Sequence, residues 1–378
     1  MKKTSILLAI ALIMTGTAFA YAEDGADGAD MVFTGDEIKL SLDGAEKAAL
    51  AGGLAIEAAE ANLKADKAKN RSYYENSVDI RSLQDAGLLA SKSQRQMIDL
   101  ASEFSKAQAQ KNYDAAINQI VRDTEEIYYQ VAQAQEAVRI SGENVAVQET
   151  LYKNTQSKYN LGVVAKQDVL LAEIGLNNAK VSAQTAQTAY DNARMGFNIK
   201  FGYDLMQNIT LTDTLTEVPV SSIGLGDAIN KALENRNEIA GADFGLKMAE
   251  LTLTETGNTV SKYSAQYMNA QVSLLKAQDA QNNAPKAVEM DVRSKYMDMQ
   301  QKKAAVDLGK LNVANAQETY RLANLQYDAG MATLTDTQQA QLGAYQTELG
   351  YYSTLLAYNL SVVDYEQATT VGTSSIPL

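Results

Sequence analysis

The sequence contains no cysteine, no histidine and no tryptophan in its 378 residues. Without cysteine there is neither a disulfide framework nor a thiol nucleophile, and without histidine the commonest proton shuttle is missing. Cysteine and histidine are also the usual ligands of zinc. The carboxylates, serines and lysines that remain form no arrangement typical of catalysis. The composition therefore predicts that the protein is not an enzyme and that it uses no metal and no cofactor.

Proline is almost as scarce, and acidic residues outnumber basic ones. The three prolines are Pro219, Pro285 and Pro377, and such scarcity is typical of long uninterrupted helices. The formal net charge of −13 disfavours binding to nucleic acid or to an anionic lipid surface. After the first residues, no apolar run is long enough for a transmembrane helix. We therefore expect long helices, no nucleic-acid partner and no membrane-spanning segment in the mature chain.

Residues 1–22 have the pattern of a secretory signal peptide. Two lysines precede an apolar run, which is followed by small-x-small cleavage sites at 18–20 and 20–22. The run is too short to span a bilayer, which favours cleavage over an uncleaved membrane anchor. Residues 23–38 follow as an acidic, glycine-rich leader, for which a flexible solvated segment is favoured over a calcium site. The protein is therefore expected to be exported to the cell envelope.

An internal repeat is the most informative feature that the sequence does contain. The pattern Tyr-x-x-Gly-x-x-x-x-x-Asp-x-x-x-Ala occurs twice in one frame. Its residues are Tyr159, Gly162, Asp168 and Ala172 in the first copy and Tyr327, Gly330, Asp336 and Ala340 in the second. Apolar residues recur at every seventh position before each tyrosine, and a second heptad pattern follows each glycine, which predicts long helices in coiled-coil packing. The short glycine connection makes the two helices antiparallel neighbours.

These patterns predict an all-α fold of two tandem repeats, each made of long antiparallel coiled-coil helical hairpins, with little or no β structure. The expected organisation is a first repeat over 39–200, a linker over 201–224, a second repeat over 225–368 and a frayed tail over 369–378. A long helix is expected from about Ala115 to Tyr159. The linker has room for a short strand around Ile209.

The far bend of each repeat, opposite its glycine turn, is marked less clearly. In the second repeat the polar stretch before Pro285 predicts a bend at 281–285, with the proline in the first turn of the next helix. In the first repeat the bend lies anywhere from 85–87 to 110–112. Apolar residues near both bends have helical spacing. We therefore expect plain helical bends within 72–110 and 259–284.

The doubled motif resembles the TolC family of outer-membrane efflux ducts. Both repeats also open with Leu-x-x-Ala-x-x-x-Ala-Leu, at Leu42 and at Leu225, and the resemblance covers roughly residues 39–372. It implies a homotrimeric tube that crosses the periplasm and docks on a periplasmic adaptor (membrane fusion) protein, which connects it to an inner-membrane transporter. It also implies strands that enter the outer membrane at the far bends, and the helical spacing found there departs from the family in this respect.

The resemblance assigns roles to the residues around the two glycine turns. The turns that would dock the adaptor are Leu161, Gly162 and Val163 in the first repeat and Ala329, Gly330 and Met331 in the second. Asp336 would line a constriction ring, and Asp168 and Tyr327 would belong to the network of the closed state. Ala332 stands where the family often has a basic residue that closes the gate, so that ion pair is expected to be absent.

Helix chemistry offers a simpler interpretation of the same residues. The two glycines suit left-handed positions at helix C-termini. Thr333 and Asp336 match a capping box, and Asp168 complements the dipole of the helix that it opens. Tyr159 and Tyr327 suit the packing seam between helices. Two functions therefore remain open: a helical duct or sleeve of an efflux or secretion system, and a non-transporting extracytoplasmic coiled-coil scaffold.

Overall fold

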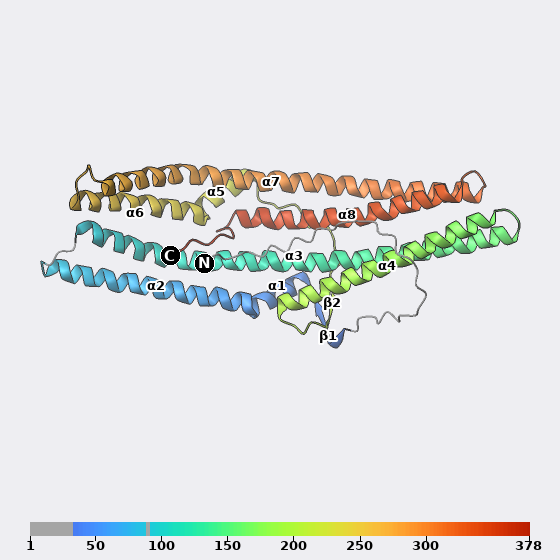
Figure 1. The fold of residues 1–378 in the computed structure, drawn as a ribbon, viewed down its shortest axis with the longest axis horizontal. Helices are drawn as coiled ribbons and strands as arrows, with labels where there is room; N and C mark the ends of the chain where they lie inside the picture. The colour runs from blue at the N-terminus through green and yellow to red at the C-terminus, as the bar shows by residue number, and fades with distance from the viewer. Residues whose placement is uncertain (1–32, 88–90) are drawn as a thin grey trace. The chain divides into compact units, whose positions relative to one another are not determined.

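Long helices in antiparallel pairs make up most of the chain, as the heptad pattern predicts (Figure 1). The computed structural model describes residues 33–87 and 91–378, so the expected signal peptide and most of the expected leader lie outside the described residues. Phe33–Leu378 form one compact unit. Its elements in chain order are β1 (Thr34–Leu40), α1 (Leu42–Ala51), α2 (Leu54–Asp85), α3 (Lys92–Asn160), α4 (Lys166–Phe201), β2 (Gln207–Leu211), α5 (Leu225–Asn235), α6 (Asn237–Thr259), α7 (Ala265–Asp328) and α8 (Leu334–Ala368). The predicted all-α fold is confirmed.

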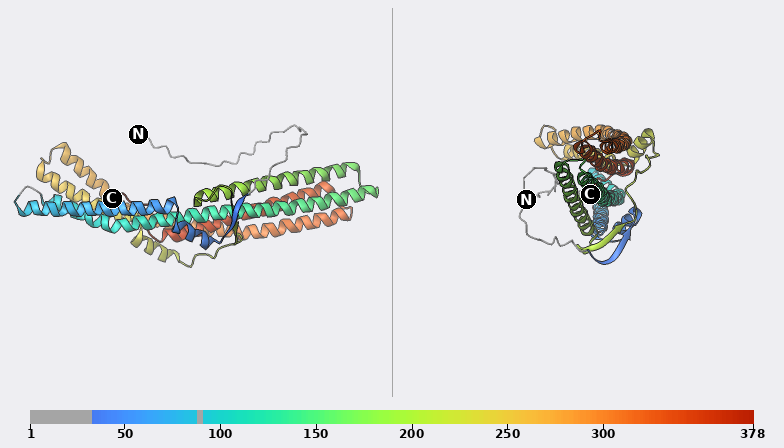
Figure 2. Two further views of the ribbon diagram at one scale, coloured as in Figure 1. Left: turned by 90° about the horizontal axis from the view of Figure 1, so that it is seen from below. Right: turned by 90° about the vertical axis from the view of Figure 1, so that its right-hand side faces the viewer.

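Each repeat contains one long helix with two shorter partners. The helix α3 pairs with α2 over one half and with α4 over the other, and α7 pairs with α6 and α8 in the same way (Figures 1 and 2). The two repeats pack on each other because α8 contacts α3 and, near the tips, also contacts α4 (Figure 1). The two glycine turns therefore lie at one end of this unit, and the two far bends lie at the other.

Heptad positions of the long helices are buried where the pairs meet. Val131 in α3 and its counterpart Met299 in α7 are both buried, and the small Ser141 is buried on α3, where it lets a neighbouring helix come close. Near the middle of the unit, the same helices enclose the main core together with β2 and the linker. The largest side chains buried there are Tyr128, Phe197, Tyr358 and Tyr365.

A two-stranded parallel sheet lies beside this core. Ile38 of β1 pairs with Ile209 of β2, and Leu40 pairs with Leu211. All four side chains belong to the core or pack against it, as the two-residue alternation of a strand allows. The short strand predicted around Ile209 is therefore confirmed.

The leader predicted over 23–38 is wrong from Thr34 onward, where the chain forms β1. Thr210 Oγ1 of β2 donates a hydrogen bond to the carboxylate of Glu37 on β1 over 2.6 Å. This bond also lowers the pKa of Glu37. The strand β1 could not be predicted from its own residues, because its pairing partner β2 lies in the linker, far along the chain.

The far bend of the first repeat lies at the beginning of the predicted range. The helix α2 ends at Asp85, and Gly87 adopts a left-handed φ of 71°. Ser91 then caps α3, with its Oγ accepting a hydrogen bond from the backbone N–H of Gln94 over 3.0 Å. The helix α3 consequently starts well before the predicted Ala115. Residues 88–90 lie outside the described residues.

The bend predicted at 281–285 in the second repeat is wrong, because α7 runs through Pro285 without a break. The chain turns instead at 260–264, where Ser264 caps α7 by accepting from the backbone N–H of Tyr267 over 3.2 Å. A proline inside a helix removes one backbone hydrogen bond and costs about 3 kcal/mol relative to alanine. Burial of Val288 and Val292 just beyond it helps to offset this cost. In the described residues both far bends connect helices, and no strand lies in either bend, as expected.

Replacing Pro285 with alanine is expected to raise the free energy of unfolding by about 1–3 kcal/mol, because the alanine restores the missing backbone donor. Urea denaturation followed by circular dichroism measures the change. Pro219→Ala serves as a control, since Pro219 lies in the linker outside any helix. An effect of Pro285→Ala no larger than that of the control would place the proline at a helix start and contradict the continuous α7.

The tail predicted to fray over 369–378 is also in contact with the rest of the structure. Asparagine side chains of α3 and α6 bind its backbone, and Ile376 packs on α6. The tail consists mainly of small and polar residues, which is why it resembles a disordered end in the sequence. Within the part of the chain that the structure describes, no helix is both long and apolar enough to cross a bilayer.

Candidate functional site

The two glycine turns have the same backbone geometry and lie at the same end of the helices (Figures 1 and 2). Gly162 has φ 74° and Gly330 has φ 73°, a left-handed conformation that favours glycine. The N–H of Val163 donates to Lys158 O over 2.9 Å, and the N–H of Met331 donates to Gln326 O over 2.8 Å. These are the bonds of the Schellman motif, so the predicted left-handed C-caps are confirmed.

The turns present apolar side chains to solvent. Leu161, Val163 and Met331 are 79%, 70% and 76% exposed. In many Schellman motifs the residue after the glycine packs on the residue that begins the last helical turn. Here that earlier residue is Lys158 in one turn and Gln326 in the other, so neither offers an apolar partner. Each tip therefore carries apolar surface with no partner within its own hairpin.

The helices that follow the turns begin as the capping interpretation predicts. Asp168 accepts a hydrogen bond from the backbone N–H of Ala165 over 3.2 Å at the start of α4. At the start of α8, Asp336 accepts from the N–H of Thr333 over 2.9 Å, and Thr333 Oγ1 accepts from the N–H of Asp336 over 3.2 Å. The hydrogen bonds from the Thr333 side chain and backbone lower the pKa of Asp336. Among the described residues, the hydrogen bonds of both aspartates are those to their own helix starts.

Tyr327 and Tyr159 occupy equivalent places in the repeat but different environments. Tyr327 is buried, and its hydroxyl lies 3.2 Å from Thr155 Oγ1 on α3. The Nζ of Lys158 lies 3.8 Å from the centre of the Tyr327 ring and 3.1 Å from Asp328 Oδ1. Seam packing is therefore confirmed for Tyr327 and wrong for Tyr159, which is exposed. The two tips are linked to each other through Tyr327 and Lys158.

Lys158 is the residue of this site that the sequence analysis missed. Ala332 lacks the basic side chain that the resemblance places there, yet an ammonium group does reach the end of α7, supplied from α3. The only sequence signal is its position directly before Tyr159. In the described part of the chain, no group of three or more acidic side chains is arranged to hold a metal ion.

No family model matches the sequence, and a search of curated proteins found no match. Solved structures do match. The outer membrane protein VceC from Vibrio cholerae aligns with a TM-score of 0.70 at 14% identity, over 88% of this chain and 97% of that chain. A membrane protein from Pseudomonas aeruginosa gives 0.70 at 12% identity, over 88% and 90%. The CmeC outer membrane channel of Campylobacter jejuni gives 0.65 at 14% identity, over 88% and 86%. At such low identity the likeness shows the fold, and this chain has the fold of the TolC-family outer membrane channels.

Proposed function

We propose that this chain is a cell-envelope component of an efflux or secretion system, in which three copies form a helical duct that docks an adaptor through its tips. The observation that carries the proposal is the pair of matching glycine turns, which lie at one end and expose apolar side chains. The fold shared with outer membrane channels supports the same role. The protein acts through its geometry, as a conduit between an inner-membrane transporter and the outer membrane.

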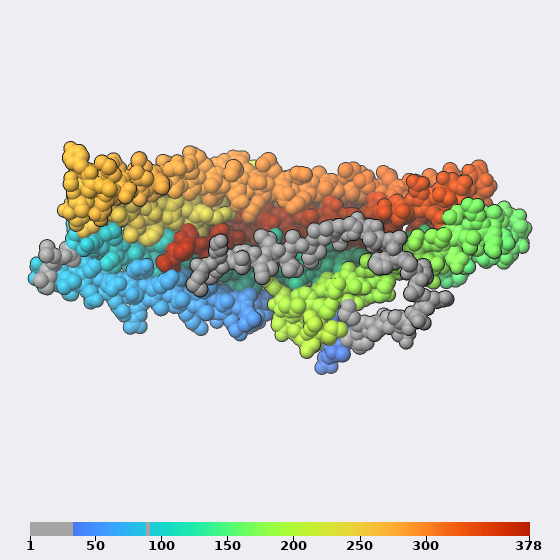
Figure 3. Space-filling view, in the orientation of Figure 1, coloured from blue at the N-terminus to red at the C-terminus, as the bar shows by residue number. Residues whose placement is uncertain are grey.

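Unpartnered apolar stripes support assembly from several copies. The helices α7 and α4 both carry exposed apolar side chains, and α7 runs along one whole border of the unit in the space-filling view (Figure 3). The exposed apolar residues of α7 include Met290, Met297, Leu308, Leu311, Leu322 and Leu325, and those of α4 include Leu170, Ile174, Val181 and Ile199. Several of those on α7 lie a multiple of seven residues apart, which is typical of a coiled-coil seam. Contact between the α7 stripe of one copy and the α4 stripe of the next forms a closed ring of three when each copy is rotated by about 120° relative to its neighbour.

Replacing Gly162 and Gly330 with valine is expected to abolish co-purification of the adaptor. A β-branched residue strains a left-handed turn by roughly 1–2 kcal/mol, so the turn rearranges and the tip loses its form. A Cβ at either glycine meets no atom within 4 Å, so the strain arises in the backbone and not from a clash. The measurement is quantitative mass spectrometry of proteins retained by the tagged duct after cross-linking, with a loss of at least tenfold expected.

Gly343→Ala is the matched control, because Gly343 lies within α8 and a Cβ there also meets no atom within 4 Å. It should leave adaptor recovery unchanged. Unchanged recovery of the adaptor by the double valine variant would rule out docking through these turns.

A scaffold without transport is the second candidate. It is favoured by the helical far bends, which occur where the TolC resemblance implies strands. A scaffold predicts a single copy in solution, or an assembly with no continuous central opening. Three-fold rings with an open centre in electron micrographs would count against it.

A further inference from the structure

The last residues of the chain form a strap between the far hairpins of the two repeats. After α8 ends at Ala368, residues 372–378, which we call the strap, run in an extended form between α3 and α6 (Figure 1). Most of the strap is exposed, and its hold on the helices comes from a few specific contacts. These contacts lie away from the tip turns, and none of them is a hydrogen bond that caps a helix.

Three asparagines bind alternate backbone groups of the strap. Asn118 donates to Gly372 O over 2.8 Å, and Asn237 donates to Ser374 O over 2.8 Å. Asn112 pairs with Ile376 twice, accepting from its N–H over 2.9 Å and donating to its C=O over 2.8 Å. A spacing of two residues is that of an extended chain. The asparagine amides therefore bind the strap as a neighbouring peptide strand would, largely independent of its side chains.

Two glycines allow the strap to pack closely on the first turns of α6. A Cβ on Gly241 of α6 would lie 2.6 Å from Ile376 Cδ1, so the missing side chain opens a notch for the isoleucine. Gly372 has φ 77°, and a Cβ on it would lie 3.1 Å from Arg236 Nε. The notch selects an aliphatic residue at the position of Ile376, and the left-handed turn favours glycine where the strap leaves α8.

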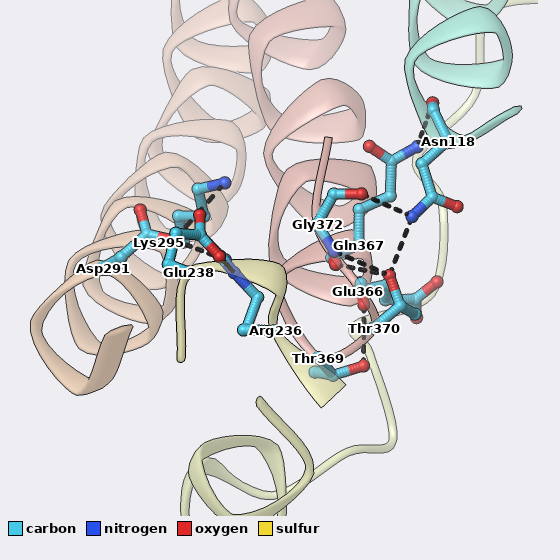
Figure 4. Close-up of polar contacts among 10 residues, drawn as sticks. All are labelled: Asn118, Arg236, Glu238, Asp291, Lys295, Glu366, Gln367, Thr369, Thr370 and Gly372. Atoms are coloured by element: carbon cyan, nitrogen blue, oxygen red, sulfur yellow. Dashed lines mark hydrogen bonds and ion pairs between the residues drawn. The ribbon is translucent and has the colours of Figure 1, made fainter. Parts of the chain in front are cut away.

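The strap lies in a groove between α3 and α6, and an ion-pair cluster around Arg236 borders this groove beside Gly372 (Figure 4). The guanidinium of Arg236 lies 2.7 Å from Glu238 Oε1 and 2.8 Å from Asp291 Oδ2, which ties the start of α6 to α7. Figure 4 also shows Asn118 joined to Gly372, and Gln367 of α8 joined to Asn118. The ion pairs that border the groove are made by residues outside the strap.

Direct packing of α3 on α6 also joins the two far hairpins. Phe104 of α3 stacks on Phe244 of α6 with ring centres 4.0 Å apart, and Ser91 donates to Glu255 near the bends. The strap adds α2 to this connection, because Lys69 Nζ donates to Leu378 O over 3.3 Å. A cavity of about 230 Å³ lies between α2, α3 and residues 375–378. Individual neutral hydrogen bonds contribute little net stability, so such a strap can detach without unfolding the helices.

We propose that the strap is a releasable clamp on the two far hairpins, and that its groove is a binding site for an extended peptide with an aliphatic residue at the position of Ile376. The chain's own segment 372–378 occupies the site in this structure. Detachment of the strap removes the link that it makes between α2 and α6, while α3 keeps its own contacts with both helices. The proposal stands independently of the duct function.

Deleting residues 372–378 is expected to speed amide hydrogen exchange in α2 and α6 at least tenfold, with no change around the Gly162 turn. A synthetic peptide with the sequence of residues 369–378, added in excess, should restore the slow exchange. The same peptide with Ile376→Asp should not. Exchange that is unchanged by the deletion, or restored equally by both peptides, would overturn the proposal. So would faster exchange at the Gly162 turn, because the strap would then support the whole fold.

If the variant that lacks residues 372–378 does not fold, single substitutions in the full chain test whether the strap holds the far hairpins. Ile376→Asp places a carboxylate in the Gly241 notch and should speed exchange in α2 and α6 at least tenfold. Thr373→Asp is the matched control, because Thr373 lies in the same strap with an exposed side chain. It should behave as the unaltered protein does. Equal effects of the two substitutions would show that the notch does not hold the strap.

Discussion

Glu125→Gln is expected to remove a loss of stability that the unaltered protein suffers as the pH rises from about 4.5 to about 7. Glu125 lies on α3 and is only 9% exposed. Burial raises its pKa from 4.5 to about 7, and the negative charges of Glu46, Glu366 and Asp364 act in the same direction. Its charged neighbours on α1 and α8 are therefore of like sign. The basic Arg122 forms its ion pairs with Asp364 and Glu126.

The direction of this change in stability with pH follows from the number of protons that the folded and unfolded states bind. Between pH 4.5 and 7 the unfolded chain has released the proton of Glu125, and the folded protein still holds it. Stability therefore falls as pH rises through this range and levels off above the folded pKa. At about 1.4 kcal/mol per pH unit, the loss amounts to about 3 kcal/mol. Glutamine keeps the shape of the side chain and has no proton to lose.

Urea denaturation at pH 5, 6, 7 and 8 measures this difference. The free energy of unfolding of the Glu125→Gln variant, relative to the unaltered protein, should increase steadily up to pH 7 and then stay constant. Glu103→Gln is the control, since Glu103 lies on the same helix with an exposed side chain. A difference between Glu125→Gln and the unaltered protein that is the same at all four pH values would contradict the raised pKa.

Tyr358→Ala is expected to lower the free energy of unfolding by about 3–5 kcal/mol, because it leaves a cavity in the main core. Tyr358 of α8 is fully buried, and its hydroxyl donates to Val218 O over 3.2 Å, which ties the linker to the helices. Tyr358→Phe removes the hydroxyl alone and should cost about 1 kcal/mol. The comparison separates packing from hydrogen bonding at this position.

Tyr263→Ala is the matched control, because Tyr263 is 89% exposed at the far bend of the second repeat. Its effect should stay within about 0.5 kcal/mol. Thermal or urea unfolding gives all three values. If Tyr358→Ala and Tyr263→Ala cost the same, the core does not lie where α8 meets the linker.

The elements that could be predicted from the sequence are those whose signals are local. The left-handed Gly162 and Gly330, the capping box of Thr333 and the heptads of the long helices all depend on residues within a turn or two of each other. Pro285 shows the limit of such signals. Its polar surroundings resemble a helix start, yet α7 continues through it and buries Val288 and Val292 just beyond.

The elements that could not be predicted depend on contacts between distant residues. The strand β1 pairs with the linker, and Asn112 binds Ile376 across 264 positions of sequence. Lys158 reaches the end of α7 from the other repeat. No pattern within a single segment indicates such pairs. At the tips, the backbone of both turns was predictable, whereas adaptor docking by Leu161, Val163 and Met331 stays a prediction.

Electron microscopy of the purified protein, viewed along the helix axis, tests most directly whether copies of this chain form a duct. The proposal predicts rings of three copies around an open centre, with the exposed stripes of α4 and α7 buried between neighbouring copies. Particles that contain a single copy, or closed bundles with no central opening, would contradict it.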